Sequence, residues 1–126
     1  MIETNCMQFV IRKKMAEEKI ITALNSLFGF LVDTADFNVP GAVGVAQILD
    51  YSEGFAQSCL VSWPRKYKPE LNQEETAKAL ANKLGVDVMV DLDLDDEESQ
   101  WLLAQPHLPS RKVDVVHLSD GVDIKQ

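Results

Sequence analysis

The sequence predicts one α+β domain in which two main helices pack on a mainly antiparallel sheet of about five to six short strands. Two segments, near residues 15–29 and 73–84, carry apolar residues at helical spacing. Alternating segments lie between and after them, joined by short turns that favour antiparallel pairing. The 126 residues are 46% hydrophobic and 25% charged, which is enough for one core and too short for two domains. We therefore expect residues 1–126 to form a single domain.

The first predicted helix rests on six apolar residues that share one face of a 3.6-residue repeat. They are Ile20, Ile21, Leu24, Leu27, Phe28 and Leu31. Glu17 and Glu18 lie near its start, where acids suit the helix dipole. We expect a break near Gly29, because glycine readily ends a helix.

The segment before this helix can be interpreted in two ways. The helix begins at Met15, or it reaches back through Phe9 and Cys6. Residues 5–14 could instead form a short strand, and of the two we favour the helix. Residues 1–14 are also a candidate for a peripheral N-terminal extension.

Alternation then replaces the helical period. A short strand is expected near residues 30–32, and Asn38 to Gly41 is typical of a turn. In residues 43–51 the odd positions are large and apolar except for Gln47, and residues 55–63 repeat the pattern. We predict an antiparallel hairpin, with Gly54 supplying the turn and Pro64 ending the second strand.

The second predicted helix has signals at both ends. Asn72 is typical of an N-cap, and Glu75 three residues later completes a capping-box pattern. The apolar stripe ends at Leu84, and Gly85 follows where a left-handed C-terminal cap belongs.

A strand over residues 86–94 follows, with valine and leucine on one face and carboxylates on the other. We expect the carboxylates of this strand, including Asp91, to face solvent. Further strands are predicted over residues 101–104, 112–118 and 122–124, separated by prolines and by a turn at Asp120 and Gly121.

Charge is unevenly distributed along the chain. There are 20 acidic and 12 basic residues, for a formal net charge of -8. Residues 84–110 contain no Lys or Arg and seven acids: Asp87, Asp91, Asp93, Asp95, Asp96, Glu97 and Glu98. Elsewhere 13 acids face 12 bases. This concentration disfavours nucleic acid and anionic membranes as partners and favours a basic protein surface.

No motif for metal binding or catalysis is visible. A calcium loop starting at Asp91 would need glycine in place of Asp96 and glutamate in place of Leu102. His107 and His117 lack partners at zinc-ligand spacing, and Cys59 on a strand is typical of a packed small residue. Phosphate-loop, dinucleotide and nucleophile-elbow patterns do not occur. We expect no cofactor and no metal, and enzymatic activity is the less favoured interpretation.

The expected location is the cytoplasm. The first residues lack a basic segment followed by an apolar one, and the most apolar stretch, residues 20–32, is too short and too interrupted to span a bilayer. Cys6 and Cys59 are far apart and are expected to be reduced thiols.

These observations favour a non-enzymatic acidic binding module. Its most concrete form is a small bacterial immunity or antitoxin-type inhibitor that docks a basic partner. The expected contact residues are Asp91, Asp93, Asp95, Asp96, Glu97 and Glu98. One alternative is an acidic secretion-chaperone-like homodimer that binds an extended segment. Another is a small enzyme or ligand-binding domain without a visible motif.

Overall fold

The computed structural model describes residues 4–34, 41–92 and 100–125 of the chain. Its elements, in order, are β1 (Thr4–Ile11), α1 (Glu17–Phe28), β2 (Val32–Thr34), β3 (Gly44–Asp50), β4 (Glu53–Gly54), β5 (Gln57–Pro64), α2 (Gln73–Leu84), β6 (Val88–Asp91), β7 (Trp101–Ala104), β8 (Arg111–Val113), β9 (Val115–Leu118) and β10 (Gly121–Ile124). The predicted α+β class is confirmed, with more strands than the sequence indicated.

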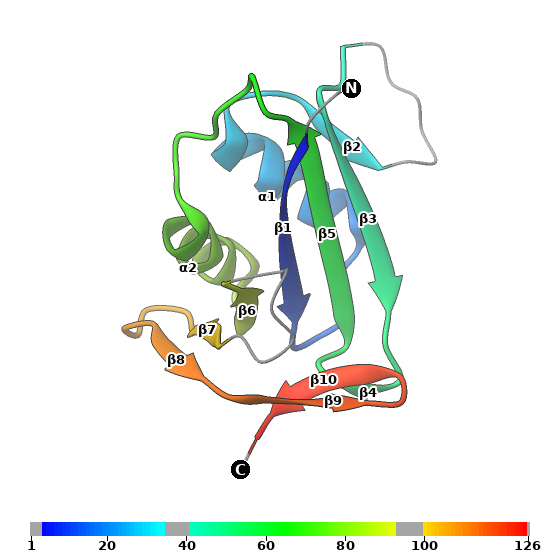
Figure 1. Ribbon diagram of the computed structural model, residues 1–126, viewed down its shortest axis with the longest axis vertical. Coiled ribbons are helices and arrows are strands. Elements are labelled where there is room, and N and C mark those ends of the chain that lie inside the picture. The colour runs from blue at the N-terminus through cyan, green and yellow to red at the C-terminus, as the bar shows by residue number, and fades with distance from the viewer. Residues whose placement is uncertain (1–3, 35–40, 93–99, 126) are drawn as a thin grey trace.

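In the described part of the chain, seven strands form a large sheet in the order β2-β3-β5-β1-β6-β7-β8. All neighbours are antiparallel except β2 and β3, which run parallel. Both helices pack on one face of this sheet, and in Figure 1 α1 lies behind β1 and β5. The main core therefore lies between the helices and the sheet, around Phe9, Leu24 and Leu80, each of which is at most 1% exposed.

A small sheet, in the order β4-β10-β9, lies at one end of the molecule (Figure 1). It closes a second core that contains residues from the face of the large sheet opposite the helices. Its buried members are Val10, Phe55, Met89, Trp101, Leu103, Val113 and Val122. The large sheet is therefore covered on both faces at this end, as is typical where strands are almost wholly apolar.

The N-terminal segment is a strand and not the helix that we favoured. β1 pairs with β5 over eight positions and with β6 over three, so residues 4–11 lie inside the sheet and not at the periphery. Phe9, Val10 and Ile11 are at most 1% exposed because successive residues face the two different cores. A strand buried on both faces loses its alternation, and its apolar run resembles a helical one.

The hairpin of β3 and β5 is confirmed, but the large apolar residues at the odd positions of β3 do not face the main core. Gly44 and Ala46 face the helices, while Val45 and Leu49 are 44% and 51% exposed. There is little room beside Gly44 on this face: an added Cβ would approach the Val32 side chain on β2 at 3.0 Å and the Phe30 ring at 3.3 Å. The small residues therefore occupy the inner face, and the larger ones face outward.

The caps predicted for α2 are confirmed. Asn72 accepts a hydrogen bond from the Glu75 backbone N–H, and Glu75 accepts one from the Asn72 backbone N–H. Gly85 is left-handed and donates its N–H to the Ala81 carbonyl. The break after α1 also falls at Gly29, as expected.

Trp63 and Trp101 each lie in one of the two cores. Their side chains are 4% and 3% exposed, and each belongs to a different core cluster. The strand expected over residues 112–118 is divided into β8 and β9, which belong to different sheets. Most of the turn expected at Asn38 to Gly41 lies outside the described residues.

Candidate functional site

The predicted contact residues lie in residues 91–98, which we call the acidic segment. It begins at the end of β6, where Asp91 is buried and only 8% exposed. The expectation that Asp91 faces solvent is therefore wrong. Asp91 shares its face of the sheet with Met89, which belongs to the second core, and it pairs with Trp101 on β7. The Gln73 side chain reaches its backbone carbonyl at 3.5 Å. Burial on both faces of β6 explains why alternation in the sequence did not mark solvent exposure.

The other five predicted contact residues follow β6 directly and lie outside the described residues. They are Asp93, Asp95, Asp96, Glu97 and Glu98. Both ends of this connection are held in the large sheet: Asp91 is paired with Trp101, and the Leu92 N–H donates to the Gln100 carbonyl at 3.4 Å. The connection therefore joins two neighbouring strands of the core.

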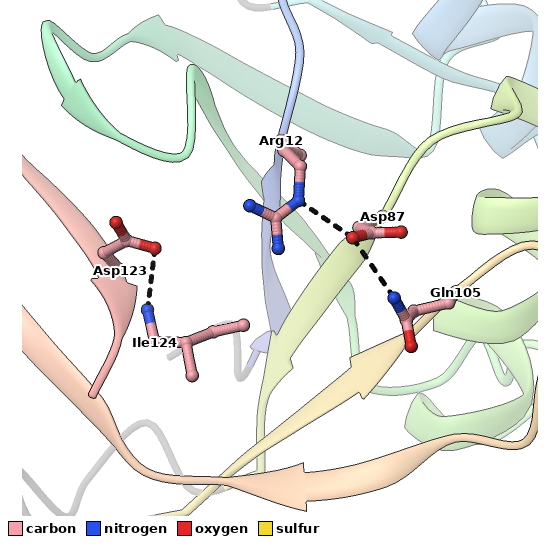
Figure 2. A network of polar contacts seen from close by, with 5 residues as sticks. All are labelled: Arg12, Asp87, Gln105, Asp123 and Ile124. Atoms are coloured by element: carbon pink, nitrogen blue, oxygen red, sulfur yellow. Dashed lines mark hydrogen bonds and ion pairs between the residues drawn. The ribbon is translucent and has the colours of Figure 1, made fainter. Parts of the chain in front are cut away.

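Asp87, the first of the seven acids in residues 84–110, forms an ion pair with the distant Arg12 (Figure 2). The Arg12 Nε atom lies 2.8 Å from the Asp87 carboxylate, and Gln105 donates to the same oxygen at 3.4 Å. The Arg12 guanidinium also lies 4.5 Å from the centre of the Phe55 ring. Asp87 is paired and Asp91 is buried. Of the seven acids in residues 84–110, the candidates for contact with a partner are therefore the five in residues 93–98.

Two carboxylates near the turn of the β3-β5 hairpin, Asp50 and Asp120, have a pKa below the ordinary value. A hydrogen bond from Lys14, whose Nζ atom lies 3.0 Å away, and a second from Gln57 lower the pKa of Asp50. The pKa of Asp120 is lowered because its carboxylate accepts bonds from the Ser52 hydroxyl at 2.6 Å and from the Ser52 N–H at 3.0 Å. The Asp120 contact ties the hairpin turn to the small sheet.

Cys59, His107 and His117, which the sequence offered for catalysis or metal binding, lie in different environments. Cys59 is buried, and burial raises the pKa of its thiol to about 12, so the nucleophilic thiolate is scarce near neutral pH. His107 is exposed in a loop, where its backbone N–H donates to the Asn82 side-chain oxygen. His117 is exposed on β9. No group of three or more His, Cys, Asp or Glu side chains in residues 4–34, 41–92 and 100–125 is arranged to hold a metal ion.

An open groove of about 590 Å³ runs between the two helices. Its polar lining includes Lys19 and Lys83 together with the hydroxyl residues Thr22 and Ser26. None of the residues that the sequence singled out for chemistry or for partner binding lines it.

The face of the large sheet opposite the helices carries a feature that the sequence did not reveal. On β1, β5 and β3 this face is uncharged and holds the exposed residues Val45 and Leu49. The large apolar residues at odd positions of β3 were visible in the sequence, but alternation alone does not tell whether such a face is buried or exposed. Only the position of the helices shows that these residues point away from the main core.

Of the helices in the described chain, none has the length and apolar character needed to cross a membrane. Comparisons with protein-family models, with curated proteins and with solved structures found no match for this chain.

Proposed function

We propose that the protein is a non-enzymatic binding module that docks a basic protein partner through its acidic segment. Of the six contact residues predicted from the sequence, Asp91 is buried and holds the start of the segment in the sheet, so the proposed contacts are Asp93, Asp95, Asp96, Glu97 and Glu98.

The observation that carries this proposal is the concentration of charge. Seven acids and no Lys or Arg occur in residues 84–110, whereas the rest of the chain is nearly neutral. Like charges in close sequence repel one another, so such a segment is less stable than a mixed surface until a cation or a partner neutralises it. A solubilising surface needs net charge but does not need that charge to be gathered in one connection.

The placement of the segment adds support. Binding residues are most effective on a connection whose ends are fixed by a rigid scaffold, because little ordering is then required on binding. The acidic connection begins and ends on the paired strands β6 and β7, which are buried. A field of one sign in such a place also speeds the approach of a basic partner at low salt.

In its most concrete form, the proposal describes a small bacterial immunity or antitoxin-type inhibitor. Such a protein would cover the cationic, nucleic-acid-facing site of a nuclease-like toxin. The acidic segment would supply charge complementarity, and neighbouring apolar side chains would supply contact area.

The test is an affinity capture from an extract of the source cell, washed at low and at high salt. A variant with Asn at positions 93, 95 and 96 and Gln at positions 97 and 98 removes five charges. A control variant removes five exposed charges elsewhere, through E17Q, E18Q, E70Q, E74Q and D114N.

We expect one basic protein that elutes as salt rises, that the control variant retains and that the segment variant loses. Equal retention by the segment variant and the wild type would refute docking through the acidic segment. Equal loss from both variants would assign the effect to net charge alone.

The alternative of an acidic secretion-chaperone-like dimer also has an observation in its favour. Val45 and Leu49 expose apolar surface on an open face of the sheet, and such surface can hold an extended apolar segment. A complex that persists at high salt and survives the loss of the five acids would support this function over the first.

A further inference from the structure

Three cross-strand rows make up the outer face of β1, β5 and β3, which we call the uncharged face. The first row is Cys6, Ser62 and Val45, the second is Gln8, Leu60 and Gln47, and the third is Val10, Ser58 and Leu49. The rows follow from the strand register, which sets Ser62 opposite both Cys6 and Val45 and repeats this arrangement two residues along each strand.

None of these nine residues is charged, in a chain where one residue in four is. Cys6, Val45, Gln47 and Leu49 are exposed, Gln8, Leu60 and Ser62 are partly exposed, and Val10 and Ser58 are buried toward the small sheet. In the described part of the large sheet, the two strands that flank these three carry acids at Asp33 on β2 and Asp91 on β6. Depletion of charged residues distinguishes the core of protein interfaces from ordinary surface.

We propose that the uncharged face is a self-association surface on which two copies of this chain pack sheet against sheet. The distribution of charge on the chain favours a second copy as the occupant of this face. Two copies that each carry a formal charge of -8 repel one another, and the contact that brings the fewest charges together is the one between two uncharged faces. A basic partner would gain no charge complementarity here.

The chemistry of the face also suits a copy of itself. A two-fold axis that runs parallel to the sheet, between the two copies and above Leu60, sets Leu60 against its own copy. The same axis sets Gln8 and Gln47 against glutamines of the second copy. An amide both donates and accepts, so two glutamines can pair in a symmetric contact, whereas two like charges cannot. Val45 and Leu49 add apolar area on one side of this centre.

The size of the face predicts weak association. Three strands about 4.8 Å apart, with about five to six residues each at about 3.3 Å per residue, cover roughly 300 Å² in projection. A standard interface buries about 800 Å² on each partner, so we expect a dissociation constant of about 10 μM or weaker. Association should then depend on concentration and should be reversible.

The first test is sedimentation equilibrium of the full chain from about 1 μM to about 1 mM, a range set by the expected weak affinity. V45E and L49E place a charge on the uncharged face. Their matched controls are V116E on β9 and L108E in a loop, because Val116 and Leu108 are 39% and 53% exposed but lie elsewhere.

We expect each face variant to raise the dissociation constant about tenfold or more, and each control to leave it unchanged within about twofold. A wild-type chain that stays monomeric over the whole range would overturn the proposal. So would a dimer that V116E or L108E disrupts and L49E does not.

Cys6 provides a second measurement without any substitution. The sequence has two cysteines, and Cys6 is exposed on the uncharged face whereas Cys59 is buried. We expect a thiol reagent to modify Cys6 more slowly at high than at low protein concentration in the wild type, and we expect a smaller difference between the two rates in L49E. A rate that does not change with wild-type concentration would count against burial of Cys6 between two copies.

Salt separates this inference from the proposed function. Added salt screens repulsion between two acidic copies, so it should strengthen self-association, whereas it should weaken docking of a basic partner. Loss of five charges from residues 93–98 should likewise strengthen the dimer while weakening that docking. A dimer that salt dissociates would contradict association through the uncharged face and would leave the docking proposal to its own test.

Discussion

Replacement of Gly54 by alanine tests the close approach of β4 and β10, which joins the small sheet to the rest of the fold. Gly54 has φ +67°, a conformation that residues with a Cβ rarely adopt. A Cβ at this position would overlap the carbonyl oxygen of Val122 and lie 2.8 Å from its carbonyl carbon. The same oxygen accepts the Phe55 N–H at 2.9 Å, so the overlap falls on a contact that closes the second core.

The expected loss of stability has two parts. The left-handed conformation costs an L-residue about 1–2 kcal/mol. Separation of β4 from β10 adds the strain of overpacking, about 1–3 kcal/mol. Together they amount to about 2–5 kcal/mol, a large fraction of the roughly 6–19 kcal/mol expected for a domain of this length.

Urea denaturation of G54A and G85A separates the two parts. Gly85 has φ +70°, and a Cβ there would meet nothing within 4 Å, so G85A carries only the backbone cost. We expect G54A to lose about 1–3 kcal/mol more than G85A, and amides of β10 to exchange faster in G54A. Equal losses in the two variants would show that the approach of β4 and β10 imposes no steric limit and would refute this reasoning.

Two further predictions concern polar contacts. N72A should lower the free energy of unfolding by about 1 kcal/mol, because the Glu75 backbone N–H loses the Asn72 side-chain oxygen that accepts its hydrogen bond, whereas N72D keeps such an oxygen and should stay within a few tenths. Urea denaturation measures both variants, and equal stability of N72A and the wild type would contradict the role of the cap. D120N should be less stable than the wild type at neutral pH. The hydrogen bonds from Ser52 lower the pKa of Asp120 in the folded state below its ordinary value of 3.8. A carboxylate whose pKa is lowered by folding stabilises the folded state at pH values above its unfolded pKa. The difference should vanish as the pH falls through the folded pKa, and a difference that persists in acid would show that the charge of Asp120 is not its cause.

The sequence predicted α2 in detail because its signals are local. Asn72, Glu75 and Gly85 each satisfy a backbone group within a few residues of themselves, so their effect does not depend on the rest of the fold. The hairpin of β3 and β5 was predicted for the same reason, since its turn is set by neighbouring residues.

The errors arose where distant segments decide the environment. Whether Phe9, Val10 and Ile11 form a strand depends on β5 and β6, which lie about 50 and 80 residues away in the sequence. Which face of β3 is buried depends on the preceding segment, because the Val32 and Phe30 side chains leave no room for a Cβ at Gly44.

The candidate site shows the same division. The concentration of acids is a property of the sequence and was visible at once, but the burial of Asp91 depends on the second core around Met89 and Trp101. The pairing of Asp87 with Arg12 joins residues 75 positions apart. The uncharged face could not be predicted, because its three rows exist only once β1, β5 and β3 are in register.

The central position of β1 has a consequence for folding during synthesis on the ribosome. Its first partner, β5, ends at Pro64, and its second, β6, begins at Val88, so β1 leaves the ribosome long before either strand can pair with it. During that interval the apolar run of Phe9, Val10 and Ile11 has no strand to cover it and is open to non-native pairing. Because these contacts span long stretches of sequence, we expect slow folding and a yield of native protein that depends on chaperones at high expression.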